Sequence, residues 1–274
     1  MKTNDLNKIE TKLLLSAIKQ RYGYDFEQYA KASLNRRLKR VQEIIGVEHL
    51  SQMIPMVLHD EEVFETFLRS MSVVVTEMFR NPEFFSEFRK KVIPILKTYP
   101  FVKIWHAGCA TGEEVYSTAI ILYEEGFYDR AQIYATDYNH HAIKIAMNGH
   151  YNVIKFDDYN KNYLEAGGKG SLSDYYHINN STASVISELK ENIVFSHHNL
   201  VSDGVFGEMN VVICRNVMIY FSSELQNRVL RLLNDSLCRN GYLCLGDKES
   251  LKMTVVEKLY ETVCKKSRIY RRKN

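Results

Sequence analysis

The residues best suited to chemistry lie between an apolar run and a helical pattern. The largely apolar run Phe101–Trp105 stops before Gly108, and an amphipathic helical pattern starts directly after Gly112. In an α/β sheet, glycines in such a turn let the backbone approach a ligand, which then faces the free N–H groups of the first helical turn. The pattern predicts a ligand site here, although a tight strand-to-helix connection also explains the glycines when they are taken alone.

Two acidic residues after this turn restrict the kind of ligand. Glu113 and Glu114 follow Gly112 without a lysine, so the turn is no phosphate-binding loop of the GxxxxGK[ST] kind. Two carboxylates repel phosphate and suit a ligand that carries hydroxyls, an ammonium or a sulfonium. S-adenosylmethionine (SAM) has all three groups and is the expected cofactor. An NAD-dependent dehydrogenase is disfavoured, because pyrophosphate would meet these carboxylates and the GxGxxG spacing is absent.

Polar residues at the ends of other predicted strands extend the site. Asp137 follows the strand 131–136, and its carboxylate can accept hydrogen bonds from both ribose hydroxyls. Alternatively, Asp137 caps the helix that begins at Asn139. The next two strand ends carry His198, Asn199, Leu200, Arg215 and Asn216. Each residue singly has a structural explanation, but polar residues at four strand ends together favour a ligand site.

Composition excludes several classes of protein. The 274 residues allow one large domain or a small and a medium one. The five cysteines are odd in number and lack CxxC spacing, so we expect no disulfide framework, no metal site and a cytoplasmic location. No apolar run approaches the roughly 20 residues of a membrane span, and Met1–Glu10 lacks a signal-peptide core, so we expect no membrane insertion. A net charge of +3 gives no indication of nucleic acid.

The elements that must position these residues change in character along the chain. Residues 1–75 are helical in pattern, with Leu34, Leu38, Val41 and Ile45 on one helix face and Gly46 at that helix's end. Strands are predicted at 101–106, 131–136, 192–197, 209–214, 241–246 and 267–272, and helices at 113–125, 139–147 and 223–238. This alternation predicts an α/β fold with a mostly parallel sheet covered on both faces.

Two segments have patterns of their own. Residues 150–191 predict a short helix and a small antiparallel β insertion, with a long surface loop as the alternative. The pair Asn240-Gly241 predicts a turn just before the fifth strand.

Upstream of the sheet, Arg80 can clamp a carboxylate with its planar guanidinium, or pair with Glu77 or Glu83 on the surface.

Several spaced blocks resemble one known family in the right order. They are Thr76–Arg80, Ala107–Ser117, Thr136-Asp137, Asn199-Leu200, Arg215–Phe221 and Gly246–Ser250. Over nearly its full length the chain resembles the CheR family, the glutamate methyltransferases of chemotaxis receptors. The resemblance implies an N-terminal helical domain at 1–75, a connecting helix at 76–100 and a Rossmann-like SAM domain at 101–274, with the β insertion at about 155–191.

The resemblance also implies roles for individual residues. The implied SAM contacts are Thr76, Arg80, Gly108, Glu113, Glu114, Asp137, Asn199, Leu200, Arg215 and Asn216. Tyr220 is expected beside the methyl group, where its hydroxyl orients the incoming receptor carboxylate, with Arg80 as the second catalytic candidate. A glutamate has a pKa near 4.3 and is ionised at pH 7, so its methylation to an ester needs no general base.

The basic helix at about 34–45 has an implied partner. Receptor methylation regions are acidic helical bundles, onto which a basic surface formed by Arg36, Arg37, Lys39 and Arg40 could steer the enzyme. The alternative is a solvated helix face without a partner. A receptor tail adding a strand to the β insertion is a further possibility from the resemblance. Nothing in the pattern requires more than a monomer, and no nucleic-acid partner is expected.

Some positions depart from the family pattern. Val74 replaces a frequent cofactor-binding Asn, Met78 an aromatic residue, Val115 a proline, and Asp247-Lys248 the usual His-Ser. These departures keep two alternatives open: a SAM-dependent methyltransferase with another substrate, and a SAM-binding scaffold that has lost catalysis. Retained cofactor affinity without turnover on any receptor would distinguish the scaffold.

Overall fold

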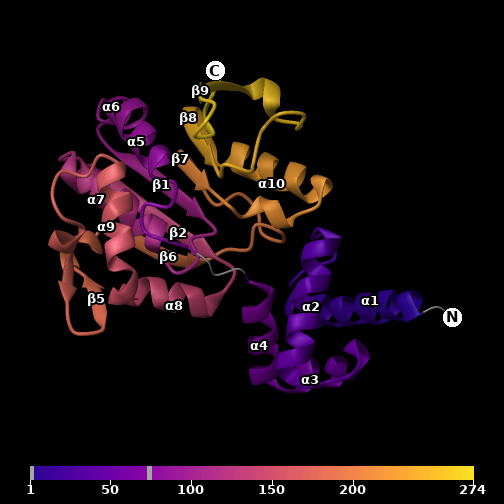
Figure 1. Ribbon diagram of the computed structural model, residues 1–274. Coiled ribbons are helices and arrows are strands. Elements are labelled where there is room, and N and C mark those ends of the chain that lie inside the picture. The colour runs from indigo at the N-terminus through magenta and orange to yellow at the C-terminus, as the bar shows by residue number, and fades with distance from the viewer. Residues whose placement is uncertain (1–2, 73–75) are drawn as a thin grey trace. The chain divides into compact units, whose positions relative to one another are not determined.

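The computed structural model describes residues 3–72 and 76–274, with side chains from residue 5 onward (Figure 1). The described chain forms two compact units. The N-terminal helices, together with 201–203 and 220–229, make up the first unit, and most of the remaining chain makes up the second. Val74, where a missing cofactor contact was expected, lies outside the described residues.

The first unit is built from amphipathic helices. They are α1 (Thr3–Tyr22), α2 (Lys31–Ile45), α3 (Met53–His59) and α4 (Glu61–Met71), with a 3-10 turn at Leu50–Gln52. Helix α2 buries Leu34, Leu38 and Val41, as its apolar spacing predicts. Gly46 caps its C-terminus. Its φ of 78° is a left-handed conformation that glycine adopts without steric strain because it has no Cβ, and its N–H donates to the Gln42 carbonyl. The predicted helical character of this region is confirmed.

A seven-stranded sheet forms the second unit. Its strand order is β6-β2-β1-β7-β8-β10-β9, parallel from β6 to β8 and antiparallel at β10 and β9. The strands are β1 (Val102–Ala107), β2 (Ala131–Asp137), β6 (Ile193–His197), β7 (Met209–Cys214), β8 (Leu237–Leu245), β9 (Tyr260–Cys264) and β10 (Ile269–Arg272). The helices of this unit are α5 (Pro82–Lys91), α6 (Ile93–Leu96), α7 (Glu113–Glu124) and α8 (His140–Asn148), and the second unit also contains the end of α10 (Ser223–Asp235) from Leu230 onward. The predicted α/β class with a mostly parallel sheet is confirmed.

The insertion between α8 and β6 folds as a small module. It contains β3 (His150–Asn152), α9 (Phe156–Glu165), β4 (Tyr176–Ile178) and β5 (Thr182–Val185), with antiparallel strand order β3-β5-β4. The helix and the β excursion are thus confirmed, and β3 is an addition that the sequence pattern did not indicate. A strand of three residues is too short to show an alternating pattern.

Two predictions about the C-terminal part of the sheet domain, one on a turn and one on a helix end, are wrong in detail. Asn240-Gly241 lies inside β8, and α10 ends at Asp235 rather than 238. Met209 pairs with Leu237 and Val211 with Tyr242, so residues 238–241 bulge from the ladder and Asn240 takes a φ of 60° there. Asn240 and Gly241 therefore form part of a bulge within one strand, and not a turn between two elements.

None of the helices in the described part of the chain is long and apolar enough to cross a membrane.

Candidate functional site

The predicted site residues gather at the carboxyl edge of the parallel strands. Strand β1 lies between β2 and β7: after β1 the chain adds β2 and β6 on one side of it, and then returns to add β7 and β8 on its other side. Ligands of open α/β sheets bind at such a point, outside the carboxyl ends of the strands. The turns after β1, β2, β6 and β7 are those that carry the expected glycines, Asp137, Asn199 and Arg215.

The turn after β1 has a backbone that requires glycine. Gly108 has a φ of 86° and donates its N–H to the Thr136 carbonyl at 2.8 Å. A Cβ at Gly108 would lie 2.6 Å from Cγ2 of Val217, and one at Gly112 (φ 91°) would lie 2.8 Å from Cβ of Ala146. Both positions therefore combine a left-handed conformation with close packing. The turn is held tightly against β2, α8 and the loop after β7.

Asp137 lies at the end of β2 and holds this turn. Its two carboxylate oxygens accept the N–H groups of Ala110 and Asn139, each at 2.9 Å. Helix α8 is capped by Asn139, which accepts from His141 and Ala142, so the alternative in which Asp137 caps this helix is wrong. Burial raises the pKa of Asp137, and the backbone N–H groups oppose that rise. With the Tyr138 N–H as a third backbone donor, the carboxylate, which has about four lone-pair sites, still has acceptor capacity for a ribose hydroxyl.

Glu113 presents a buried acid in the first turn of α7. Its carboxylate accepts the Thr111 hydroxyl at 2.7 Å, and burial raises the pKa of Glu113 to about 7. In the described part of the chain it forms no ion pair. Its charge also acts on buried tyrosines of the insertion. After burial, it is the next cause that raises the pKa values of Tyr151 and Tyr159, and for Tyr176 it follows burial and Tyr116. Such a carboxyl group suits a ligand ammonium, which would supply the missing cation.

Glu114, its neighbour, is already paired. Its Oε2 lies 2.6 Å from Nη1 of Arg215 and its Oε1 lies 3.3 Å from Nδ1 of His106. Burial alone would raise the pKa of Glu114, but Arg215 and His106 outweigh it and hold the pKa below its usual value. The geometry therefore assigns Glu114 an internal ion pair, and its predicted SAM contact stays a prediction.

Arg215 connects three segments of the second unit. Besides Glu114, its Nη2 donates to the Arg80 carbonyl at 3.2 Å and to Oδ1 of Asn81 at 3.0 Å. Its guanidinium lies 4.0 Å from the centre of the Phe84 ring. The side chain is only 1% exposed, so Arg215 fixes the approach of the Arg80 segment to β7. Any part it takes in holding SAM is a prediction that this geometry leaves open.

The remaining predicted cofactor residues are distributed along the same edge. Asn199 and Leu200 are each 7% exposed, directly after β6. Asn216 has a φ of 62° after β7, while Thr76 and Arg80 are half-buried before α5. Their roles toward SAM remain predictions.

Tyr220 belongs to the first unit, where Arg37 holds it. The Arg37 guanidinium lies 4.4 Å from the centre of the Tyr220 ring and donates to the Met71 carbonyl, and Ala30 N–H donates to the Tyr220 carbonyl at 2.9 Å. Arg37 is 5% exposed, whereas Arg36, Lys39 and Arg40 are exposed. Burial therefore removes Arg37 from the expected basic surface, which keeps its other three members. Helical spacing alone could not separate them, because Arg37 is buried by a segment 183 positions away in the chain, counting from 37 to 220.

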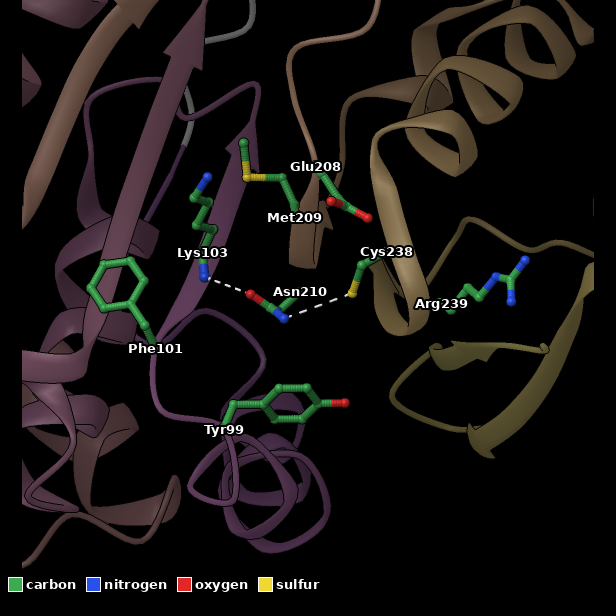
Figure 2. A pocket seen from close by; sticks show the side chains of 8 residues that line it. All are labelled: Tyr99, Phe101, Lys103, Glu208, Met209, Asn210, Cys238 and Arg239. Carbon is green, nitrogen blue, oxygen red and sulfur yellow. Dashed lines mark hydrogen bonds between the residues drawn. The ribbon is translucent and has the colours of Figure 1, made fainter.

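A hollow of about 490 Å³ lies away from these residues. It opens at the amino ends of β1 and β7, lined by Lys103, Asn210 and Cys238 among others (Figure 2). Figure 2 shows Asn210 bridging this place, accepting from the Lys103 N–H at 2.8 Å and donating to the sulfur of Cys238 at 3.7 Å. Since ligands of such sheets bind at the carboxyl edge, this hollow is not the candidate site.

The sequence indicates one residue with a central place in the hydrogen bonding, Glu249, only as a member of a family block. Glu249, after β8, accepts four backbone N–H groups from the turns after β7 and β8. No periodicity or spacing in the sequence indicates such a role. Three of the donors are backbone groups about 30 positions before Glu249, and the fourth is the N–H of Gly246. The only signal was its place in the block Gly246–Ser250.

The fold and this edge define an α/β protein with a site for a nucleoside-bearing cationic ligand. Residues 74–267 match the family described as CheR methyltransferase, SAM binding domain, and residues 9–72 match CheR methyltransferase, all-alpha domain. The chain belongs to the CheR methyltransferase family. It is therefore a SAM-dependent methyltransferase, and SAM is its cofactor.

Similar proteins extend over nearly the same length. The protein Cher3 of Pseudomonas putida is 42% identical over 264 residues, which cover 96% of this chain and 97% of Cher3. A chemotaxis protein methyltransferase of Listeria innocua is 26% identical, covering 85% of this chain and 87% of its own length. Among solved structures, PKMT2 from Rickettsia typhi in complex with AdoHcy is 16% identical with a TM-score of 0.33, and the alignment covers 53% of this chain and 21% of that one.

Proposed function

We propose that this chain methylates glutamate side chains in the cytoplasmic helical region of a chemotaxis receptor, forming methyl esters. The observation that carries the proposal is the match of both family domains, joined to a site that offers carboxylates to a cationic ligand. Relatives of similar length are named chemotaxis protein methyltransferases. The receptor, its glutamates and the ester linkage are the proposed part.

The residues present at the carboxyl edge fit the cofactor. The turn 108–112 brings backbone close to a ligand, Asp137 has acceptor capacity for ribose hydroxyls, and Glu113 has a buried carboxyl without an ion pair in the described chain. An ammonium beside Glu113 would favour the ionised carboxylate and lower its pKa. When bound, SAM supplies a methyl group made electrophilic by the sulfonium.

The protein's own task is to position the nucleophile. A receptor glutamate is already ionised at neutral pH, so positioning and exclusion of water supply the rate, and positioning alone contributes roughly 7–11 kcal/mol in favourable systems. We assign the Tyr220 hydroxyl to orienting the incoming carboxylate, with its ring held by Arg37. Arg80 is the candidate for clamping a carboxylate with its guanidinium.

The exposed basic side chains of α2 are assigned to the receptor. Arg36, Lys39 and Arg40 share the exposed part of the helix, opposite the buried Leu34 and Leu38. Acidic receptor helices would be attracted to this surface, which speeds encounter at low ionic strength. Their exchange for glutamine should therefore slow receptor methylation and weaken its salt dependence, without changing cofactor affinity.

Two of the departures from the family pattern, Met78 and Val115, do not favour a scaffold without catalysis. Met78 is fully buried, and its sulfur lies 3.3 Å from the Tyr176 hydroxyl and 3.9 Å from the Ser117 hydroxyl. Val115 is likewise fully buried in the core. Both substitutions are accommodated by packing, so the enzyme remains the better-supported alternative.

The first test is calorimetric titration with S-adenosylhomocysteine, the reaction product. The native protein should bind it, Asp137→Ala should lose most of the affinity, and the exposed control Asp129→Ala should behave as native. Receptor cytoplasmic fragments are then incubated with methyl-labelled SAM, and the ester is recognised by label released as methanol in alkali. Binding without labelling would point to another substrate, and absence of binding by the native protein would contradict the cofactor site.

A further inference from the structure

A buried carboxylate closes the loop that follows β7. Glu249 is 5% exposed, and its Oε2 accepts the N–H groups of Gly246 at 2.7 Å and Asn216 at 2.9 Å. Its Oε1 accepts those of Val217 at 3.0 Å and Met218 at 2.7 Å. Three consecutive amides of one loop thus point at a single carboxylate.

The chemistry of this arrangement requires an anion. Consecutive N–H groups beside a left-handed residue form a concave site for a negative charge, and Asn216 has a φ of 62°. A carboxylate has only acceptors and can receive all four N–H groups. A glutamine would turn an NH₂ donor toward two of these donors, which leaves them unsatisfied. Burial raises the pKa of Glu249, and the four N–H groups oppose that rise.

The loop that Glu249 holds packs directly on the cofactor turn. Cγ2 of Val217 would lie 2.6 Å from a Cβ at Gly108, so the side chain rests on the bare glycine backbone. A Cβ at Gly246 would lie 2.8 Å from both the Asn216 nitrogen and Oε2 of Glu249. The turns after β1, β7 and β8 therefore meet with no room between them, and the buried carboxylate of Glu249 joins the last two.

We propose that Glu249 is a positioning residue for the SAM site: it fixes the backbone of Asn216–Met218 against the Gly108 turn without contacting cofactor or substrate. The proposal rests on the cofactor site described above and not on the identity of the receptor. It explains why an ionisable side chain occupies a buried place between three strand ends, where an apolar residue would leave four N–H groups without acceptors.

The test replaces the carboxylate and then returns it. In Glu249→Ala, the dissociation constant for S-adenosylhomocysteine should rise about 10-fold, the scale on which lost supporting contacts weaken a site. Added formate, a small carboxylate, should restore most of the affinity, and formamide, its neutral counterpart, should not. The control Glu257→Ala removes an exposed glutamate from the same region, one that accepts the Met253 N–H at 2.7 Å, and the variant should respond to neither formate nor formamide.

Two further measurements separate positioning from folding. Calorimetric stoichiometry reports the folded fraction, so a merely structural role lowers the number of sites, whereas positioning weakens the affinity of sites that remain. If Glu249→Ala does not fold, Glu249→Gln is measured instead and should show the same loss of affinity at full stoichiometry. Unchanged affinity in the folded variant, or a loss in folded Glu249→Ala that formate does not reverse, overturns the proposal.

Methylation of a receptor fragment is measured on the same samples. If the native protein binds S-adenosylhomocysteine but does not label the fragment, the proposed substrate fails, and the role of Glu249 is still decided by affinity. If the native protein labels the fragment, Glu249→Ala should lose activity about 10-fold or more, with recovery in formate. Loss of labelling without change in affinity or response to formate would contradict the positioning role.

Discussion

Two pairs of adjacent glutamates lie at the two ends of helix α7. Glu113 and Glu114 occupy its first turn, whereas Glu124 is its last residue and Glu125 its C-terminal cap. The helix dipole favours acidic groups at the N-terminus and disfavours them at the C-terminus. The pair at the unfavourable end is nevertheless the one with more partners, so the dipole does not decide how these residues are used.

The C-terminal pair is satisfied by several cations and hydroxyls. Arg89 binds both glutamates, at 2.6 Å from Glu124 and 3.1 Å from Glu125. Glu124 also accepts the hydroxyls of Tyr163 at 2.5 Å and Tyr175 at 3.1 Å, while Lys97 and Lys169 bind Glu125. These partners come from α5, the segment after α6 and the β insertion, so this end of α7 fastens the insertion to the sheet domain.

The N-terminal pair is satisfied only in part. Glu114 is bound by Arg215 and His106, whereas Glu113 accepts the Thr111 hydroxyl and forms no ion pair in the described structure. The difference teaches that two adjacent acids after a glycine turn can have unlike surroundings: Glu114 is neutralised inside the protein, and Glu113 is the carboxyl that we propose for the ligand. Four predictions separate these roles, in order of expected effect.

Arg215→Met should have the largest effect on folding. It removes the cation from a buried pair and leaves Glu114 with a desolvated charge, which costs about 3–5 kcal/mol in the free energy of unfolding. Urea titration measures the loss. Arg239→Met, at an exposed position, is the matched control and should change stability by no more than about 0.5 kcal/mol. A loss below about 1 kcal/mol for Arg215→Met would show that its pairing with Glu114 is replaceable.

Glu113 should make the protein less stable as pH rises. Its pKa goes from 4.5 to about 7 on folding, so between these values the folded state binds more protons than the unfolded state, and the free energy of unfolding falls with pH. The limit is about 3 kcal/mol at pH 8, from roughly 1.4 kcal/mol per pKa unit. Glu113→Gln should remove this slope, gain stability at pH 8, and lose affinity for S-adenosylhomocysteine. Equal slopes in urea unfolding from pH 5 to 8 would contradict the assignment.

How much of the fold and of the candidate site the sequence predicts depends on whether a residue's hydrogen-bond partners are near it or far from it along the chain. The glycine turn, the acids after it and Asp137 are close in sequence to a strand end, so a local pattern marks them. Glu124 and Glu249 acquire their roles from residues that are brought near only by the fold, such as Tyr163 and Val217. No helical or alternating pattern encodes such long-range hydrogen bonds, and a bulge such as residues 238–241 is hidden for the same reason.

Glu124→Gln should weaken the structural end of α7 without affecting the ligand end. The neutral side chain loses charge-assisted bonds to Arg89 and Tyr163, with an expected cost of about 2 kcal/mol in urea unfolding. The dissociation constant for S-adenosylhomocysteine should stay within about twofold, since Glu124 lies at the other end of the helix. The exposed Glu165→Gln is the control within the insertion. A large change in affinity would mean that the insertion's attachment shapes the cofactor site.

Glu125 should give the smallest effect and the opposite pH dependence from Glu113. Burial alone would raise the pKa of Glu125, but Lys97, Lys169 and Arg89 outweigh it and lower the pKa to about 2. A depressed folded pKa gives stability that is present above the unfolded value of 4.5 and is lost as pH falls toward 2. Because Lys169 is exposed and Lys97 is partly exposed, solvent screens the cluster, and we expect only about 1 kcal/mol.

Salt separates this contribution from that of Glu113. Raising NaCl to about 0.5 M shortens the screening length to a few ångströms and should reduce the Glu125 contribution, while the buried Glu113 is screened much less. The measurement is urea unfolding from pH 5 to 3 in low and high salt, for the native protein and Glu125→Gln. High salt could instead abolish the fall of the unfolding free energy with rising pH between pH 5 and 8, and leave its fall with decreasing pH below pH 5. That result would reverse the assignment: Glu113 would be the solvent-screened charge and Glu125 the buried one.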